Sequence, residues 1–282
     1  MFQSIIDDCG LAVTRYEAVH GGDINSCYCL FTNDAKYFLK VNDATLYPGM
    51  FQKEASGLQA LNGRSVLQVP TVIKYGCVDK QQYLLMEWIE KGASGKPAWS
   101  TLGAGLATIH KHTAELFGWN EDNYIGSIPQ ENTQHVSWHQ FFTDCRVMPL
   151  VELLCEKNIF SELDHEAALA FCEDIRDFFP LEPPSLLHGD LWSGNIMITA
   201  ASQPALVDPA VYFGHREMDI GMTLLFGGFD ETFYSAYNDV YPLANGWRER
   251  VYVTQLYPLL VHALLFGGGY IANVREILGT RR

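Results

Sequence analysis

The chain contains 282 residues, of which 48% are hydrophobic and 18% are charged. This composition supports one large globular domain or two smaller ones, with ample material for a core. The 19 basic and 33 acidic side chains give a net charge of −14. Such a balance argues against a general binder of nucleic acid or of acidic membranes, because those proteins present basic surfaces.

The chain carries no signal for export or membrane insertion. The stretch MFQSIIDDCGLAV has no basic segment followed by a long apolar one, so we predict no signal peptide. The most apolar stretch, LYPLLVHALLFGGGY, is interrupted by Pro258, His262 and glycines. Seven cysteines without regular spacing indicate reduced thiols, and Cys27 and Cys29 fit packing better than a metal site. We expect a soluble, cytoplasmic protein.

Strand signals dominate the first 90 residues. Aromatic and β-branched residues gather in four segments with turn residues between them, namely 26–32, 36–41, 70–78 and 82–89. One predicted helix interrupts them at residues 49–63, since its apolar residues recur at helical spacing: Phe51, Ala55, Leu58 and Leu61. This pattern predicts a small sheet with one helix.

A connector rich in glycine, serine and proline at residues 90–99 precedes a mainly helical part. Helical patterns cover 100–116, 161–179, 218–229 and 250–266. The third residue after Ser161 is Asp164, which is the spacing of a capping box at a helix start. We therefore predict two parts, residues 1–90 with the sheet and residues 91–282 with most helices, and an island of short strands within the second part.

That island contains the stretch LLHGDLWSGNIMI, in which a polar insert separates two apolar runs. The segments NIMIT and ALVD are joined by a tight turn and should run antiparallel, which brings Asn195 close to Asp208. Asp190 lies in the loop just before them. An amide and two carboxylates then surround a space suited to Mg²⁺, with one carboxylate left to accept a hydroxyl proton. A plain turn explains Asp190 and Asn195 singly, but not the whole set.

A lysine inside an apolar strand needs a partner if its charged end is buried. Lys40 lies in the segment YFLKV, and Glu54 follows on the predicted helix. In kinases, a strand lysine paired with a helix glutamate is held against the ATP α- and β-phosphates. The alternative is an edge lysine whose end reaches water.

Two further segments of the sheet part fit a nucleotide site. Gly21 and Gly22 lie between strand candidates, where a loop covering phosphates would be placed, and glycines let the backbone approach phosphate closely. The segment LLMEWIEKG ends the strand-rich part where a hinge between two lobes should fall. There the backbone of Glu87 and Ile89 can bind an adenine, with Met86 lining its pocket.

Taken together, these residues resemble the fructosamine kinase family, also called ketosamine 3-kinases. This family belongs to the wider group of aminoglycoside-phosphotransferase-like and protein-kinase-like folds. The resemblance covers almost the whole chain, in the segments GGDIN, FLKVN, MFQKEASGLQAL, MEWI, NYIGSIPQ, HGDLWSGNIM, LVDPAVYFGHREMDIGMT and FGGGY. HGDLWSGN is the most specific segment, because Trp192 and Ser193 distinguish it from the looser pattern of choline kinase-like and aminoglycoside enzymes.

The resemblance implies an α+β, bilobal, protein-kinase-like fold and transfer of the ATP γ-phosphate, with Mg²⁺, to the sugar 3-hydroxyl of a ketosamine. Such a substrate is a glycated amine or a glycated protein lysine, so a deglycation or repair role follows. The family's functional positions fall on Asp190 (proton acceptor), Asn195 and Asp208 (magnesium), Lys40 and Glu54 (ion pair), and Met86, Glu87, Trp88 and Ile89 (adenine hinge). The chain should be a monomer or a homodimer.

Asp219 follows Asp208 by only eleven positions in the chain. A protein kinase needs a longer segment there to dock a peptide, so we expect a small acceptor or an exposed sugar adduct on a protein. The sequence DPA also replaces the protein-kinase DFG, which removes the phenylalanine switch and favours constitutive activity.

Other residues near the insert have two interpretations each. His188 anchors the loop through hydrogen bonds or acts as a base. Asp219 either has a structural role, in which it caps the following helix or braces the loop, or contacts the substrate directly. Trp192 forms a platform for the sugar ring or packs in the core. By their place in the sequence, His215 and Glu217 lie within reach of the opening of the predicted site around Asp190, and they are candidate acceptor-binding residues.

Two alternatives to a ketosamine kinase stay open. One is a kinase of the same fold for another small hydroxyl substrate, such as an aminoglycoside, a choline-like alcohol or a sugar. The other is a nucleotide-binding pseudokinase. The presence of the five chemistry-bearing residues argues against the latter: Lys40, Glu54, Asp190, Asn195 and Asp208.

Overall fold

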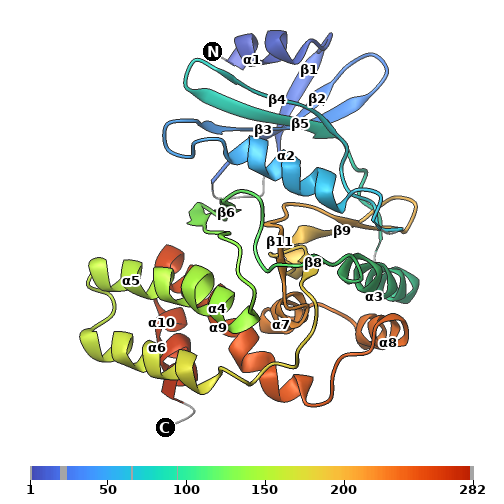
Figure 1. Cartoon of the computed structure of the whole chain (residues 1–282). Coiled ribbons are helices and arrows are strands. Elements are labelled where there is room, and N and C mark those ends of the chain that lie inside the picture. Colours follow the sequence, from blue (N-terminus) through green and yellow to red (C-terminus); the bar gives the residue numbers. More distant parts are fainter. Residues whose placement is uncertain (1, 20–23, 65, 94, 280–282) are drawn as a thin grey trace.

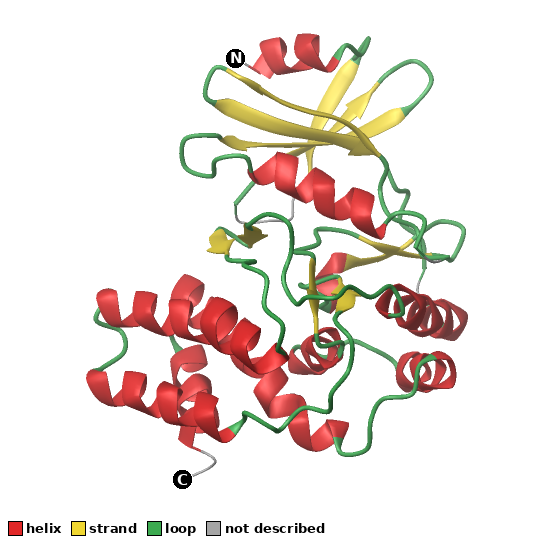
Figure 2. Ribbon diagram, viewed as in Figure 1, coloured by secondary structure: helices red, strands yellow, loops and turns green. Residues whose placement is uncertain are grey.

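The computed structural model describes residues 2–19, 24–64, 66–93 and 95–279. A sheet-containing part lies above a mainly helical part in the view of Figure 1, and Figure 2 shows the same division by type of element. The predicted α+β architecture is therefore confirmed. The division that we place near residue 90 stays a prediction. It falls between the last strand of the sheet, which ends at Glu87, and helix α3, which begins at Lys96.

Five antiparallel strands form the sheet in the order β1-β2-β3-β5-β4. They are β1 (Arg15–Val19), β2 (Ser26–Phe31), β3 (Lys36–Asp43), β4 (Val72–Val78) and β5 (Gln81–Glu87). Four of them match the predicted segments. The sequence analysis did not predict β1, a short edge strand of five residues that has no fully buried side chain. The register of the inner strands sets Lys40 opposite Leu84 of β5.

Two helices accompany the sheet. Helix α2 (Met50–Leu61) confirms the predicted helix, and its buried face joins residues of β5 in one apolar cluster. In Figure 1 it lies between the sheet and the helical part. Helix α1 (Phe2–Cys9) was not predicted. It buries Ile5 and Cys9 with the other face of the sheet, and the Tyr83 hydroxyl donates to the Asp8 carboxylate.

The second part contains most helices and several short strands. The helices are α3 (Lys96–His110), α4 (Trp138–Phe142), the π-helical turn η1 (Thr143–Val147), α5 (Met148–Glu156), α6 (Glu162–Asp174), the 3-10 turn η2 (Ser193–Asn195), α7 (Glu217–Leu225), α8 (Glu231–Val240), α9 (Trp247–Phe266) and α10 (Gly269–Gly279). The strands are β6 (Asn123–Ile125), β7 (Ile128–Gln130), β8 (Ser185–Leu187), β9 (Ile196–Ile198), β10 (Pro204–Leu206) and β11 (Tyr212–Gly214).

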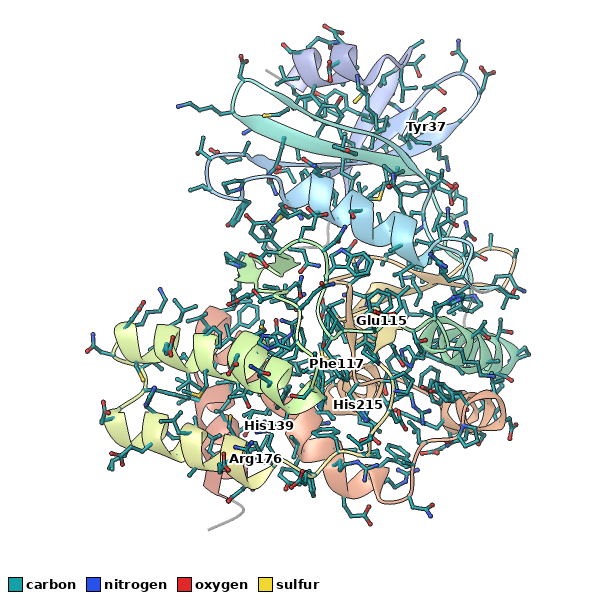
Figure 3. The ribbon with its side chains drawn as sticks, in the orientation of Figure 1. Tyr37, Glu115, Phe117, His139, Arg176 and His215 are labelled. Carbon is teal, nitrogen blue, oxygen red and sulfur yellow. The ribbon has the colours of Figure 1, made fainter. Side chains whose placement is uncertain are left out.

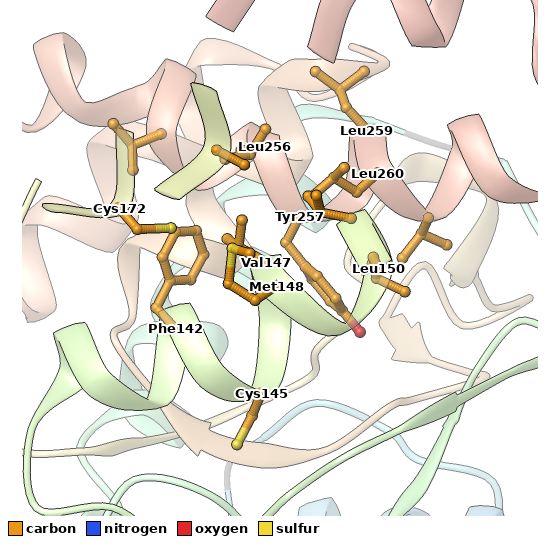
Figure 4. Packing of buried hydrophobic residues seen from close by; sticks show 14 of the residues in the cluster. Phe142, Cys145, Val147, Met148, Leu150, Cys172, Leu256, Tyr257, Leu259 and Leu260 are labelled. Carbon is orange, nitrogen blue, oxygen red and sulfur yellow. The ribbon is translucent and has the colours of Figure 1, made fainter. Parts of the chain in front are cut away.

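The core of this part forms around α9. Figure 4 shows side chains of the α4–α5 region, among them Phe142 and Met148, facing Leu256 and Tyr257 of α9. Close packing of this kind gives the site a rigid base. The predicted capping box at the start of α6 is present, because the Ser161 hydroxyl accepts from the Asp164 amide and the Asp164 carboxylate accepts from the Ser161 amide.

Helix α3 differs from its predicted bounds at both ends. It begins earlier, at Lys96, where Pro97 occupies the first turn, a position that suits proline. It ends earlier, at His110, because the following residues pair with another segment. The Leu186 amide donates to the His112 carbonyl, and the Ala114 amide donates to the Pro184 carbonyl. Long-range pairing here overrides the local helical pattern.

The β9–β10 hairpin is tied to the connector between the two parts. The Gly92 amide donates to the Ile198 carbonyl over 2.7 Å, and the Ala200 amide donates to the Glu90 carbonyl over 2.7 Å. A Cβ atom on Gly92 would lie 2.2 Å from the Thr199 carbonyl oxygen, so only glycine permits this approach. The connector therefore fixes the position of the hairpin that carries Asn195 and Asp208 at its ends.

All seven cysteines are free thiols, as predicted, and Cys27 and Cys29 are both buried. Among the helices of the described chain, none has the length and apolar character needed to cross a bilayer.

Candidate active site

The loop after β8 is held by the carboxylate of Asp219, at the start of α7. Its Oδ2 atom accepts from the His188 amide over 2.8 Å, and its Oδ1 atom accepts from the Gly189 amide over 2.9 Å. His110 of α3 adds a third bond, with Nε2 at 3.1 Å from Oδ2. Burial alone would raise the pKa of Asp219, but these donors hold it below its ordinary value. Asp219 therefore braces the loop, as one of its two interpretations predicted.

His188 and Gly189 fix the path of this loop. The His188 ring donates from Nε2 to the Val207 carbonyl over 3.0 Å, and its Nδ1 atom accepts from the Asp190 amide over 3.3 Å. Both ring nitrogens therefore anchor the loop, which supports the anchoring interpretation over a base. Gly189 has a φ of 84°. A Cβ atom there would lie 2.0 Å from the Ala210 carbonyl oxygen, so glycine is required.

Asp190 and Asn195 form a direct contact. The Asn195 Nδ2 atom donates to the Asp190 Oδ2 atom and to the Asp190 carbonyl, each over 2.9 Å. Burial raises the pKa of Asp190 to about 7, against the opposing effect of the bond from Asn195, and the nearby charge of Asp208 raises it further. A carboxyl group with a pKa near neutrality is suited to accept a proton.

The hairpin brings Asp208 beside Asn195, as its geometry predicted. Strands β9 and β10 pair antiparallel with Ile196 opposite Leu206, and the Val207 amide donates to the Asn195 carbonyl over 3.1 Å. Asp208 has a φ of 54°, an uncommon conformation for a residue with a side chain. Such conformations gather at functional sites, because the surrounding structure must hold them in place.

Lys40 of β3 joins this group to the sheet. Its Nζ atom lies 2.7 Å from Glu54 Oε1 and 2.6 Å from Asp208 Oδ1. The side chain of Lys40 is 5% exposed, that of Glu54 11% and that of Asp208 49%. Burial alone would lower the pKa of Lys40, but Asp208 and Glu54 together raise it above its ordinary value. The predicted pair of Lys40 and Glu54 is confirmed, and the edge-lysine alternative is not.

The oxygen atoms at the end of the hairpin fit a hard divalent cation. Because Asn195 donates from Nδ2 to Asp190, its Oδ1 atom is the one that can bind a cation. Asp208 engages Lys40 through Oδ1 and has a second carboxylate oxygen on a half-exposed side chain. No cluster of three or more His, Cys, Asp or Glu side chains suited to a metal occurs in the part of the chain that the structure describes. Mg²⁺ commonly takes few protein ligands and completes its shell with phosphate and water, so the Asn195 amide oxygen and the Asp208 carboxylate are donors of a suitable type.

The predicted adenine hinge begins with Met86 and Glu87, the last two residues of β5, and continues to Ile89. Met86 and Ile89 are buried, with 3% and 7% of their surfaces exposed, while Glu87 and Trp88 are partly buried. The Glu87 amide donates to the Thr71 carbonyl over 3.0 Å, so this amide is engaged within the protein. The Glu87 carbonyl and the backbone of Ile89 remain the candidate contacts to an adenine. Gly21 and Gly22 lie outside the described residues.

A small cavity opens beside the carboxyl group of Asp190. It is lined by Ile125, Gly189, Asp190, Tyr212, Met218, Asp219, Met222, Tyr257, Pro258, Val261 and His262. Trp192 lies outside the core, with 39% of its surface exposed, and its ring covers Gly194, where a Cβ atom would lie 2.2 Å from the indole. These observations favour the platform interpretation of Trp192 over core packing.

His215 and Glu217 have interior partners instead of a place in this lining. The His215 ring lies 4.9 Å from the ring of Phe179 and 5.9 Å from that of Trp138, and Figure 3 marks its position in the helical part. Burial lowers the pKa of His215 to about 4, which leaves the ring uncharged. Glu217 accepts two bonds from the Arg250 guanidinium, at 2.8 and 2.6 Å. These contacts give both residues structural roles.

Two histidines of the site were not found from the sequence. His110 reaches Asp219 from α3, and His262 lines the cavity from α9. Sequence spacing does not connect either of them with the polar insert at 186–198, because long-range packing brings their helices to the loop.

Removing the charge of Lys40 should destabilise the fold, because it leaves the buried Glu54 carboxylate without a cation. We expect Lys40→Met to lower the free energy of unfolding by about 3 kcal/mol, since a buried carboxylate loses its cation. Adding Glu54→Gln should restore more than about 1 kcal/mol of this loss, which urea denaturation of the two single variants and the double variant measures as a coupling.

The matched control is the exposed pair of Lys36 and Glu90, whose side chains are 43% and 56% exposed. For Lys36→Met and Glu90→Gln the same cycle should give a coupling below about 1 kcal/mol. Equal couplings for the two pairs would contradict a buried ion pair at Lys40.

Comparisons with known proteins agree with this geometry. Residues 3–281 match the family model of fructosamine kinase. The chain is 40% identical over 264 residues to the "probable ketoamine kinase" of Enterococcus faecium, covering 92% of each chain. It is 35% identical over 271 residues to the "protein-ribulosamine 3-kinase, chloroplastic" of Oryza sativa subsp. japonica, covering 94% of this chain and 78% of the relative.

A solved structure from Thermobifida fusca, which bears a fructosamine-3-kinase name, has the same fold. It matches with a TM-score of 0.87 and 32% identity, and the match covers 98% of this chain and 97% of that one. The agreement extends over both the sheet part and the helical part. The chain belongs to the fructosamine kinase family.

Proposed function

We propose that this chain is an ATP-dependent kinase that transfers a phosphoryl group to the sugar 3-hydroxyl of ketosamines. The observation that carries the proposal is the arrangement around Lys40, which contacts Glu54 and Asp208 while Asn195 contacts Asp190. Phosphoryl transfer needs a cation for the phosphates, metal ligands and a residue that aligns the attacking oxygen. Family membership and the names of the relatives support the ketosamine as acceptor.

Each side chain then has one task. Lys40, held by Glu54, binds the α- and β-phosphates of ATP. Asn195 Oδ1 and Asp208 hold Mg²⁺, which neutralises charge on the phosphates when it is bound. Asp190 accepts the proton of the sugar hydroxyl and orients its oxygen, because its raised pKa and its place at the cavity suit both tasks.

The short path from Asp208 to α7 supports a small acceptor. After Pro209 the chain enters β11, which pairs with β8, and α7 begins at Glu217. This path has no extended segment on which a peptide could dock. We infer that the substrate is a free glycated amine, or a glycated lysine that a protein presents on its surface. Without a phenylalanine switch at this position, the enzyme should be constitutively active.

A coupled assay of ADP release tests the acceptor class. We expect turnover with fructosyl and ribulosyl amines, and a phosphate at sugar carbon 3 of the product by NMR. Aminoglycosides, choline and free fructose serve as comparison acceptors. Turnover confined to one of these would favour a different small-molecule kinase. No turnover on any acceptor, together with tight Mg-ATP binding, would favour a nucleotide-binding pseudokinase.

Replacing the proton acceptor should separate chemistry from nucleotide binding. We expect Asp190→Asn to lower kcat by about 100-fold or more, because general-base assistance is lost. The affinity for Mg-ATP should stay within about threefold of the wild-type value, because Asp190 is not a proposed phosphate or metal ligand. Single-turnover kinetics and calorimetry measure the two quantities. Asp177→Asn, at an exposed position, controls for the change of charge. A near-normal rate in Asp190→Asn would refute the assignment.

Asp208 should act on the metal-dependent part of nucleotide binding. We expect Asp208→Ala to bind ATP equally with Mg²⁺ and with EDTA, because the variant lacks a metal ligand. Calorimetry under both conditions measures the difference. Asp79→Ala is the matched control. Asp79 is exposed and has a φ of 55°, close to the 54° of Asp208, so the control places alanine in the same backbone conformation. Unchanged Mg-ATP affinity in Asp208→Ala would exclude the ligand role.

A further inference from the structure

Five rings form a continuous surface beside the cavity, which we call the aromatic rim. Its members are Trp192, Phe226, His262, Phe266 and Tyr270. Neighbouring ring centroids are 6.2 Å apart for Trp192 and Phe226, 4.8 Å for Phe226 and His262, 5.5 Å for His262 and Phe266, and 5.1 Å for His262 and Tyr270. Rings at such separations are in contact. The aromatic rim is therefore one connected surface drawn from four segments of the chain.

Glycine turns bring these segments together. Gly227 and Gly228, after Phe226, have φ values of 67° and 91°, and Gly267 and Gly268, between α9 and α10, have φ values of 63° and 60°. A Cβ atom on Gly228 would lie 2.9 Å from the Ser193 Cβ atom. The turn after Phe226 thus packs against the catalytic loop, and the turn after α9 lets Tyr270 fold back toward His262.

The aromatic rim faces water to an extent that packing alone does not explain. Phe226 is 38% exposed, Phe266 58% and Trp192 39%. Contiguous exposed apolar surface of this kind marks a binding site in a folded protein. His262 belongs both to the rim and to the cavity that Asp190 lines. The rim therefore continues the candidate active site outward.

The tautomer of His262 follows from one contact. Its Nδ1 atom lies 2.7 Å from the Pro258 carbonyl oxygen, which can only accept, so Nδ1 carries the proton. Burial lowers the pKa of His262, which leaves the ring neutral. A neutral imidazole adds no positive charge to the rim.

The chemistry of a ketosamine places a positive charge at this surface. Its nitrogen is bonded to sugar carbon 1, three bonds from carbon 3, and therefore lies within about 4 Å of it. With the 3-hydroxyl at Asp190, the nitrogen reaches the mouth of the cavity and its substituent extends beyond. A secondary amine of this kind is protonated at neutral pH. Aromatic faces attract such cations, more so where water is partly excluded.

We propose that the aromatic rim binds the ammonium nitrogen of the ketosamine and the first part of its substituent, and so selects ketosamines over free sugars. This inference rests on the proposed function and names the part of the substrate that the site recognises. The net charge of −14 favours association of cations with the protein in general.

A matched pair of ligands isolates the charge. One is 1-deoxy-1-(butylamino)fructose, which is cationic, and the other is 1-O-butylfructose, a neutral ether of similar shape. Calorimetry with Mg²⁺ and a non-hydrolysable ATP analogue measures both dissociation constants. We expect the wild-type protein to bind the amine about fivefold or more tighter than the ether.

The test variant is Phe226→Leu combined with Phe266→Leu, which removes two aromatic faces and keeps apolar side chains. Its preference for the amine should fall below about twofold, and both single variants should be intermediate. Tyr75→Leu is the control, since Tyr75 is 44% exposed and lies on β4 of the sheet. It should keep the wild-type preference.

Two results would overturn the proposal while the proposed function stands. One is equal binding of amine and ether by the wild-type protein. The other is an unchanged preference in the double variant. If the wild-type protein binds neither ligand but still binds the ATP analogue, the proposed function itself fails, and the role of the aromatic rim fails with it.

Discussion

One buried carboxylate, that of Asp219, carries the geometry of the site. It accepts hydrogen bonds from the amides of His188 and Gly189 and from His110, so its charge is compensated by groups of the protein. The Asp219 carboxylate can only accept, so Nε2 of His110 donates to it, while Nδ1 of the same ring lies 2.7 Å from the Tyr237 hydroxyl. His110 then carries its proton on Nε2, toward Asp219. The catalytic loop is thus held by a chain of bonds that reaches α3 and α8.

The second constraint joins the sheet to the helical part through Lys40. Its two short contacts, to Glu54 on α2 and to Asp208 after the hairpin, place a strand, a helix and a loop around one ammonium group. The connector reinforces this, because Gly92 and Glu90 bond to the hairpin. A buried cation between two carboxylates defines their spacing more strictly than apolar packing would, because an unpaired charge at that depth is costly.

Chemistry and recognition occupy adjacent but distinct surfaces. The cavity beside Asp190 is small and is lined mainly by residues of α7 and α9. The aromatic rim is partly exposed and is built from side chains near the ends of α7, α9 and α10 together with Trp192 of the catalytic loop. His262 belongs to both surfaces. This division explains how one site can hold a fixed sugar hydroxyl while the attached amine varies.

Features encoded over short spans were readable from the sequence alone. Alternating and helical periods identified β2 to β5, α2 and α6, and the hairpin rule brought Asn195 to Asp208, because these arrangements depend on neighbours in the chain. The pairing of Lys40 with Glu54 followed from the need of a buried charge for a partner. Tertiary structure alone decided the early end of α3, the interior position of His215, and the arrival of His110 and His262 at the site. Those outcomes depend on contacts between segments more than 70 residues apart in several cases, and local periodicity carries no information about them.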